Sequence, residues 1–125
     1  MSLKDKHEKI VTGLVRSLEN EGFKIEIQKS IGKERLDIVG ITSEGIVLIE
    51  VKPSGVDVTD LMSMESSASL IKSEPEFKSK EINKFIITQE LESTSTKEIS
   101  KNLRIKIIKS DKPEEITRKI LSSMY

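Results

Sequence analysis

The sequence predicts a single α/β domain, residues 1–125, in which a central mixed sheet is flanked by helices. Three observations predict this fold class. Residues 4–21 repeat apolar side chains at helical spacing, residues 23–28 alternate apolar and polar side chains, and residues 46–52 are apolar on both faces as far as Glu50. A strand that is buried on both faces belongs in the middle of a sheet that carries helices on both sides. A chain of 125 residues is long enough to bury a hydrophobic core of its own.

The expected elements follow one another in the order α-β-β-β-α-β-α-β-α. Gly22 ends the first helix, and short polar turns join the first three strands into an antiparallel meander. In the first strand, Phe23, Ile25 and Ile27 are expected to point inward. The predicted ranges are helices over 4–21, 58–72, 95–102 and from Asp111 onward, strands over 23–28, 36–41, 46–52, 84–88 and 103–108, and a loop over 73–82.

Composition excludes several classes of function. The 21 Lys and Arg residues balance the 21 Asp and Glu residues, so a strongly basic coat for nucleic acid is excluded and any basic surface must be local. The absence of Cys excludes a thiolate zinc site, a disulfide scaffold and a Cys nucleophile. No apolar run approaches the ~20 residues of a membrane span, and the N-terminus has no apolar signal region. A soluble, cytoplasmic protein without membrane contact is therefore expected.

Two polar features are expected to be structural. The one histidine, His7, lies on the apolar stripe of the first helix, which predicts a packing residue rather than a ligand. Ser66, Ser67 and Ser69 are expected to form a small-residue face of the helix over 58–72, with no base nearby to activate a nucleophile.

Asp37 and Glu50 are carboxylates inside otherwise apolar strands. Burying an ionised carboxylate costs several kcal/mol unless it is paired or bound to a metal. The hairpin places Asp37 near Glu50, and two like charges raise each other's pKa unless a cation neutralises them. Lys52 alone offsets one charge, whereas a divalent cation offsets both, and carboxylate oxygens favour Mg²⁺ or Mn²⁺. The charged groups of Asp37, Glu50 and Lys52 are expected to lie within about 6 Å of one another.

Asp37 followed by Glu50-Val51-Lys52 resembles the signature of the PD-(D/E)xK nuclease superfamily, with Leu36 in place of the motif Pro. The order of a helix, a three-strand meander, a crossover helix and a further strand is also similar to the core of that superfamily, over about residues 5–90. Within it, the chain looks most like the small archaeal Holliday-junction resolvases. The resemblance implies a restriction-endonuclease-like fold, with a three-layer core in which a central mixed sheet lies between helices.

The resemblance also implies a Mg²⁺- or Mn²⁺-dependent nuclease that hydrolyses phosphodiester bonds of DNA, with structure-selective cleavage as one form of that activity. Asp37 and Glu50 would bind the metal, with the Val51 carbonyl as a further ligand, and Lys52 would orient or help deprotonate the attacking water. Glu8 is the candidate for an additional acidic residue from the first helix, although it lies about one turn earlier than the resolvase pattern places it. A homodimer is a further expectation from the family.

Besides the first interpretation, a metal-dependent nuclease, the sequence leaves two others open. The second is a catalytically inactive nuclease-like domain used for binding or assembly, which is favoured by the zero net charge, the few aromatic residues and a helix over 58–72 without Gln or Tyr. The third is an unrelated α/β domain in which Asp37, Glu50 and Lys52 form a structural network. Metal binding and turnover separate the first two interpretations, and convergence of the three side chains in an open cleft argues against the third.

DNA contact requires local positive charge. Lys29, Lys33 and Arg35 surround the first strand turn and adjoin the strand of Asp37, so they are the preferred candidates for nucleic-acid binding. A second basic segment covers residues 97–112, where the Lys and Arg residues either hold phosphates or protect an exposed edge strand.

Overall fold

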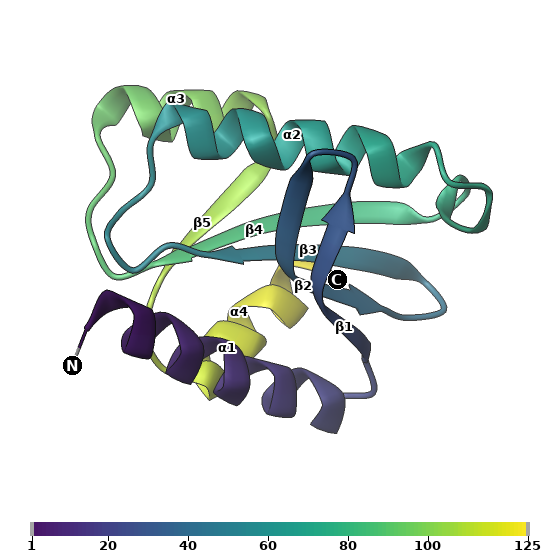
Figure 1. Ribbon diagram of the computed structural model, residues 1–125, viewed down its shortest axis with the longest axis horizontal. Helices are drawn as coiled ribbons and strands as arrows, with labels where there is room; N and C mark the ends of the chain where they lie inside the picture. The colour runs from purple at the N-terminus through teal and green to yellow at the C-terminus, as the bar shows by residue number, and fades with distance from the viewer. Residues whose placement is uncertain (1, 125) are drawn as a thin grey trace.

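A computed structural model describes residues 2–124. Helices α1 and α4 cover one face of the sheet, and α2 and α3 cover the other, so the molecule has three layers (Figure 1). Within the described part of the chain, none of the helices has the length and apolar character needed to span a bilayer. The elements are α1 (Leu3–Asn20), β1 (Lys24–Ile31), β2 (Glu34–Ile41), β3 (Gly45–Val51), α2 (Val58–Lys72), the short 3₁₀ helix η1 (Pro75–Phe77), β4 (Glu81–Thr88), α3 (Thr94–Asn102), β5 (Ile105–Lys109) and α4 (Pro113–Met124).

The sheet is mixed and has the strand order β1-β2-β3-β4-β5. The first three strands pair antiparallel as a meander, and β4 and β5 are then added in parallel by the crossovers through α2 and α3. The middle strand is β3, in which Val47, Leu48 and Ile49 are completely buried. A central strand with helices on both sides needs apolar residues on both faces, which explains the unbroken apolar run of β3. The predicted mixed sheet between two layers of helices is confirmed.

Each face of the sheet carries its own hydrophobic core. On the first face, α1 contributes Ile10, Leu14 and Leu18, which are spaced by four residues and so lie on one side of the helix. These side chains pack with Val47, Ile49 and Val51 of β3 and with Ile116 and Ile120 of α4. On the second face, α2 buries Leu61, Met64, Ala68 and Ile71 against Ile46 and Leu48 of β3. The alternation of β3 side chains between the two cores fixes the strand in the sheet.

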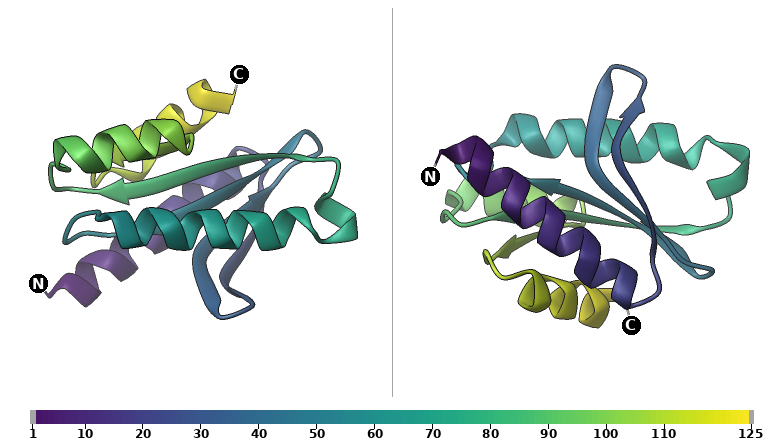
Figure 2. Two further views of the ribbon diagram at one scale, coloured as in Figure 1. Left: turned by 90° about the horizontal axis from the view of Figure 1, so that it is seen from above. Right: turned by 60° about the horizontal axis from the view of Figure 1, so that its bottom comes forward.

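The outer half of the β1–β2 hairpin bends away from the rest of the sheet and crosses α2 at a steep angle (Figures 1 and 2). Gln28 marks the bend with a φ of 51°, in the left-handed region that residues other than glycine rarely adopt. It lies opposite Asp37, between the regular pairs on either side. At the hairpin tip, Gly32 approaches α2 so closely that a Cβ there would lie 3.0 Å from Leu70 Cδ1. The expectation that Ile27 points inward is wrong, because the bend carries it out from under α1 and leaves it 58% exposed.

Most predicted boundaries agree with the structure to within a few residues, and the helix over 58–72 coincides with α2. The third strand ends at Val51, so Lys52 lies just beyond the strand rather than inside it. The fifth strand begins at Ile105 instead of residue 103, because Arg104 has a left-handed φ of 58° that is incompatible with a strand.

Candidate active site

β2 and β3 separate at one end of their ladder, and two carboxylates meet there. The last regular pair is Ile38 with Ile49. Beyond it, the Asp37 N–H donates a hydrogen bond of 2.7 Å to Glu50 Oε1, and the Val51 N–H donates one of 2.8 Å to Asp37 Oδ2. Each carboxylate therefore accepts from the backbone of the opposite strand, where a ladder hydrogen bond would otherwise lie.

These two hydrogen bonds explain how charged side chains are accommodated inside apolar strands. A buried backbone N–H without a partner costs about 1–3 kcal/mol, and the separation of the strands deprives Asp37 and Val51 of their ladder partners. An ionised carboxylate makes a stronger hydrogen bond to an N–H group than a neutral carbonyl does. The Asp37 side chain is only 13% exposed, so water has little access to these two hydrogen bonds.

Glu50 carries the largest electrostatic perturbation of the site. Burial, followed by the negative charge of Asp37, raises the pKa of Glu50 to about 7. The hydrogen bond from the Asp37 N–H and the positive charge of Lys52 act in the opposite direction. Two carboxylates in one partly buried place therefore resist simultaneous ionisation.

His7 lies next to the carboxylates. Its Nε2 is 3.0 Å from Asp37 Oδ2, the same oxygen that accepts the hydrogen bond from Val51. The sequence predicts a packing residue here, whereas the structure makes partly buried His7 a neighbour of the site. A single histidine on an apolar stripe does not indicate which residue it will contact, and Asp37 lies 30 residues further along the chain. The sequence therefore contains no signal for this contact.

Lys52 points to the N-terminus of α2. Its Nζ lies 3.5 Å from Asp60 Oδ1, while its charge still acts on Glu50. Asp60 is also part of a capping box, in which the N–H groups of Asp57 and Asp60 each donate to the other side chain at 3.0 Å. Sequence reasoning missed Asp60, although acidic residues three apart at the start of a helix are typical of such a box.

A hollow with a volume of about 100 Å³ opens beside Glu50, between the bent hairpin and α2. Arg35 contributes to it from β2, and Lys52 and Asp60 contribute from the start of the crossover. Ser63 and Ser67 of α2 line its remaining polar wall. The hollow connects the motif residues to α2.

Glu8 is not brought to the carboxylates. It is exposed on α1 and lines a different hollow, which faces Asp111 and Pro113 at the start of α4. The adjacent residue, His7, holds the position next to Asp37 instead.

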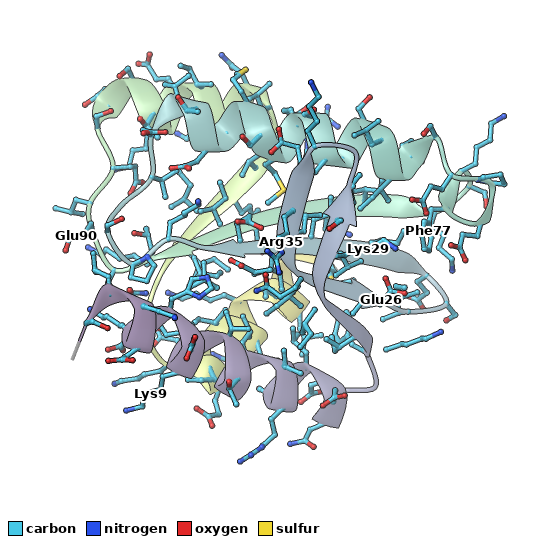
Figure 3. All side chains as sticks on the ribbon, in the orientation of Figure 1. Lys9, Glu26, Lys29, Arg35, Phe77 and Glu90 are labelled. Carbon is cyan, nitrogen blue, oxygen red and sulfur yellow. The ribbon has the colours of Figure 1, made fainter. Side chains whose placement is uncertain are left out.

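The three cations proposed for nucleic-acid contact all lie on the β1–β2 hairpin, where Figure 3 labels Lys29 and Arg35. Lys29 Nζ lies 3.1 Å from Glu26 Oε2, and this hydrogen bond raises the pKa of Lys29. Lys33 is exposed in the hairpin turn, and Arg35 is exposed at the hollow. Lys33 and Arg35 are therefore better placed than Lys29 to meet an external anion.

No group of three His, Asp or Glu side chains is arranged as a ready metal cluster within residues 2–124. The candidate oxygen donors for a cation are the carboxylates of Asp37 and Glu50.

No protein-family model and no curated protein sequence matches this chain. Solved structures do match its fold. A repair endonuclease from Pyrococcus abyssi has a TM-score of 0.67 at 19% identity, over 90% of this chain and 48% of that one. A complex of EndoMS with double-stranded DNA has a TM-score of 0.65 at 20% identity, over 86% of this chain and 45% of that one.

Can2 from Sulfobacillus thermosulfidooxidans, in complex with cyclic tetra-adenylate, has a TM-score of 0.58 at 14% identity, over 92% of this chain and 32% of that one. The chain thus spans about half the length of the repair endonuclease and of EndoMS, and a third of the length of Can2. At these identities the likeness concerns the fold. The five-stranded mixed sheet between helices is a restriction-endonuclease-like core.

Proposed function

We propose that this chain is a divalent-cation-dependent nuclease domain of the PD-(D/E)xK type that hydrolyses phosphodiester bonds of DNA. The observation that carries the proposal is the meeting of Asp37 and Glu50 where β2 and β3 separate, with Lys52 close by. The fold shared with a repair endonuclease and with a DNA-bound EndoMS supports it.

The donor atoms fit a hard divalent cation. One oxygen of each carboxylate is anchored by a backbone N–H. Among residues 2–124, the other oxygens, Asp37 Oδ1 and Glu50 Oε2, form no hydrogen bond and remain available. The N–H and C=O of one strand residue point to the same neighbouring strand, so the Val51 carbonyl faces the gap that its N–H faces. Two carboxylates with a carbonyl suit Mg²⁺ or Mn²⁺, which keeps the remaining positions for water and phosphate.

When bound, such a cation would polarise the scissile phosphate and stabilise the charge that builds on it. The protein residues have separate tasks. Asp37 and Glu50 hold the donor oxygens in place through their backbone hydrogen bonds. Lys52 places a positive charge beside the phosphate and orients the attacking water, while Asp60 holds the ammonium group at the edge of the site.

DNA is held by the hairpin in this proposal. Lys33 and Arg35, with Lys29 behind them, contact backbone phosphates without reading the sequence. Selectivity for branched DNA and a homodimer that spans both arms of such a substrate belong to the same proposal, on the basis of the resolvase resemblance.

The competing function is a catalytically inactive module for binding or assembly. The contact of His7 with Asp37 favours it, because this contact occupies a carboxylate oxygen in a network that is already hydrogen-bonded. The zero net charge also favours weak contact with DNA.

Cleavage of linear, nicked and four-way-junction DNA with Mg²⁺ or Mn²⁺ tests the proposal, with Lys52→Ala as the inactive control. Calorimetric titration with Mn²⁺ separates binding from turnover. We expect the wild type and Lys52→Ala to bind Mn²⁺, because Lys52 is not a ligand, and Glu50→Ala to lose binding. Binding to the folded state should raise the melting temperature of the first two proteins. Equal titrations of wild type and Glu50→Ala, without cleavage by either, would establish the inactive module.

A further inference from the structure

The hollow beside Glu50 is lined by a buried serine of α2 whose hydroxyl forms no hydrogen bond within the described part of the protein. Ser67 is 2% exposed and lines the hollow together with Ser63, one turn earlier on the same face of α2. The hydrogen bonds formed among residues 2–124 include none from either hydroxyl. By contrast, Ser73, Ser100, Ser122 and Ser123 each donate to a backbone carbonyl three or four residues earlier.

Ser63 and Ser67 therefore do not use the backbone carbonyl one turn earlier, which is the local partner open to a serine inside a helix. A buried hydroxyl without a hydrogen bond costs about 1–3 kcal/mol, and buried polar groups in folded proteins are paired with protein or with ordered water. Among residues 2–124, the fully enclosed side-chain atom without a partner is Gln89 Oε1 and not the Ser67 hydroxyl, so the Ser67 hydroxyl keeps contact with solvent. The hollow that Ser67 lines is the place where water reaches it.

The charges and the size of the hollow indicate which partner fits. Its lining holds two cations, Arg35 and Lys52, and three carboxylates, from Glu34, Glu50 and Asp60. The two cations do not outnumber the carboxylates, so the charge of the hollow gives no preference for a free anion such as a phosphate. The volume of about 100 Å³ has room for a few water molecules, each of which takes about 30 Å³ in the liquid. Several polar partners surround that space, as a buried water requires.

We infer that this hollow holds the water that attacks the phosphodiester, and that Ser67 and Ser63 are positioning residues for it. The inference rests on the proposed nuclease function. The water oxygen forms a new bond to phosphorus, and the ester P–O bond on the opposite side breaks. The water proton passes to solvent through the other waters of the hollow, and the leaving oxygen takes a proton from solvent. The hydroxyls of α2 thus supply the orientation that Lys52 cannot supply alone while it is paired with Asp60.

Ser67→Val tests this inference against the matched variant Ser66→Val. Both changes place a β-branched residue in α2 at the same helical cost, but Ser66 is exposed and lies outside the hollow. Valine at position 67 fills the hollow with methyl groups and displaces water. We expect Ser67→Val to lower kcat about 10-fold with KM for DNA and Mn²⁺ affinity unchanged, a smaller effect than the roughly 10²–10⁴-fold contribution of a positioned general acid or base. Ser66→Val should match the wild type.

Ser67→Ala guards against misfolding of the valine variant. It removes the hydroxyl without adding bulk, so its melting temperature should stay close to that of the wild type while kcat falls several-fold. A high-resolution crystal structure with Mn²⁺ should show ordered waters against Ser63 and Ser67, and lose them in Ser67→Val.

Three outcomes would overturn the inference. Equal kcat in Ser67→Val and Ser66→Val, with an active wild type, removes the inference but leaves the nuclease proposal intact. Anomalous scattering that places Mn²⁺ against Ser63 and Ser67, in place of water, would make that end of the hollow a cation site instead. A wild type that binds Mn²⁺ but does not cleave any DNA removes the nuclease proposal and this inference with it.

Discussion

At the scale of single residues, hydrogen bonding and charge are coupled in the same few atoms. The Asp37 carboxylate accepts from the Val51 N–H, while the Asp37 N–H donates to Glu50. The negative charge of Asp37 also raises the pKa of Glu50. One substitution at Asp37 can remove the negative charge and keep the hydrogen bond from the Val51 N–H, whereas another removes both. The two effects can therefore be measured separately.

Asp37→Asn and Asp37→Ala should behave in opposite ways. Asparagine keeps an oxygen that accepts from Val51 and removes the charge that repels Glu50, so the free energy of unfolding without metal should stay constant or rise. Alanine leaves the Val51 N–H without a partner and should cost about 1–3 kcal/mol. Urea unfolding of both variants with a chelator present checks this, and both should lack cleavage activity. An equally large loss of stability in Asp37→Asn would show that the charge itself holds the network together.

Glu50 should impose a pH dependence on stability. Its pKa of about 7 in the folded protein exceeds the value of 4.5 for the free side chain. The folded state therefore binds this proton more tightly than the unfolded state does. The contribution of Glu50 is most favourable below about pH 4.5, is lost as the pH rises toward 7, and is constant above that range.

Denaturant unfolding from pH 4 to 8 without metal measures the effect of Glu50. Glu50→Gln should remove this component of the pH dependence and be the more stable protein at pH 8. Parallel stability curves for the two proteins would show that the Glu50 carboxyl ionises in the folded state as it does in the unfolded chain.

At the scale of elements, the bend of the β1–β2 hairpin creates the site. It separates β2 from β3 at Asp37 and brings the hairpin against α2, so that the hollow lies between them. The bend depends on the left-handed backbone of Gln28. Strain at one residue of an edge strand therefore determines the geometry of two carboxylates on the neighbouring strands.

Substitutions at Gln28 should reveal this strain. Glycine adopts the φ of 51° without steric penalty, so Gln28→Gly should leave stability unchanged or raise it by up to about 1 kcal/mol. Valine should cost about 1–2 kcal/mol or straighten the hairpin. Thermal unfolding gives the energies, and amide chemical shifts of Asp37 and Val51 report the site. Glu26→Gly, in the regular part of β1, should lose about 0.5–1 kcal/mol, and a similar loss in Gln28→Gly would argue against strain.

At the scale of the whole molecule, equal numbers of positive and negative residues require any DNA contact to be local. The hairpin is the best candidate, since it carries Lys33 and Arg35 beside the site. Affinity from phosphate contacts depends on salt through the release of counterions, so each lost contact has a measurable signature.

Lys33→Gln with Arg35→Gln should weaken DNA binding and reduce the slope of log affinity against log salt by about 1 per lost contact. The matched control is Lys78→Gln with Arg118→Gln, which removes one exposed Lys and one exposed Arg elsewhere. Fluorescence anisotropy in a Lys52→Ala background measures binding without cleavage. Equal slopes in the two double variants would move the DNA contact away from the hairpin.

The sequence by itself determined the layers of the fold and the carboxylates of the site. Periodic apolar residues identified α1, α2 and β3, because the face on which a side chain lies follows from the geometry of a single helix or strand. Asp37 and Glu50 were detectable for the same reason, as charges at positions where that periodicity demands apolar residues.

The tertiary structure alone decided which groups surround those carboxylates. His7 contacts Asp37 and Lys52 contacts Asp60, and in each pair the two residues come from separate elements. These contacts depend on the angles at which the elements pack, which no local sequence pattern encodes. The bend at Gln28 exposes Ile27 and forms the hollow that Ser67 lines, although both residues belong to regular sequence patterns. Periodicity specifies the face of each element, whereas the contacts of a site depend on how the elements pack, which is a property of the whole chain.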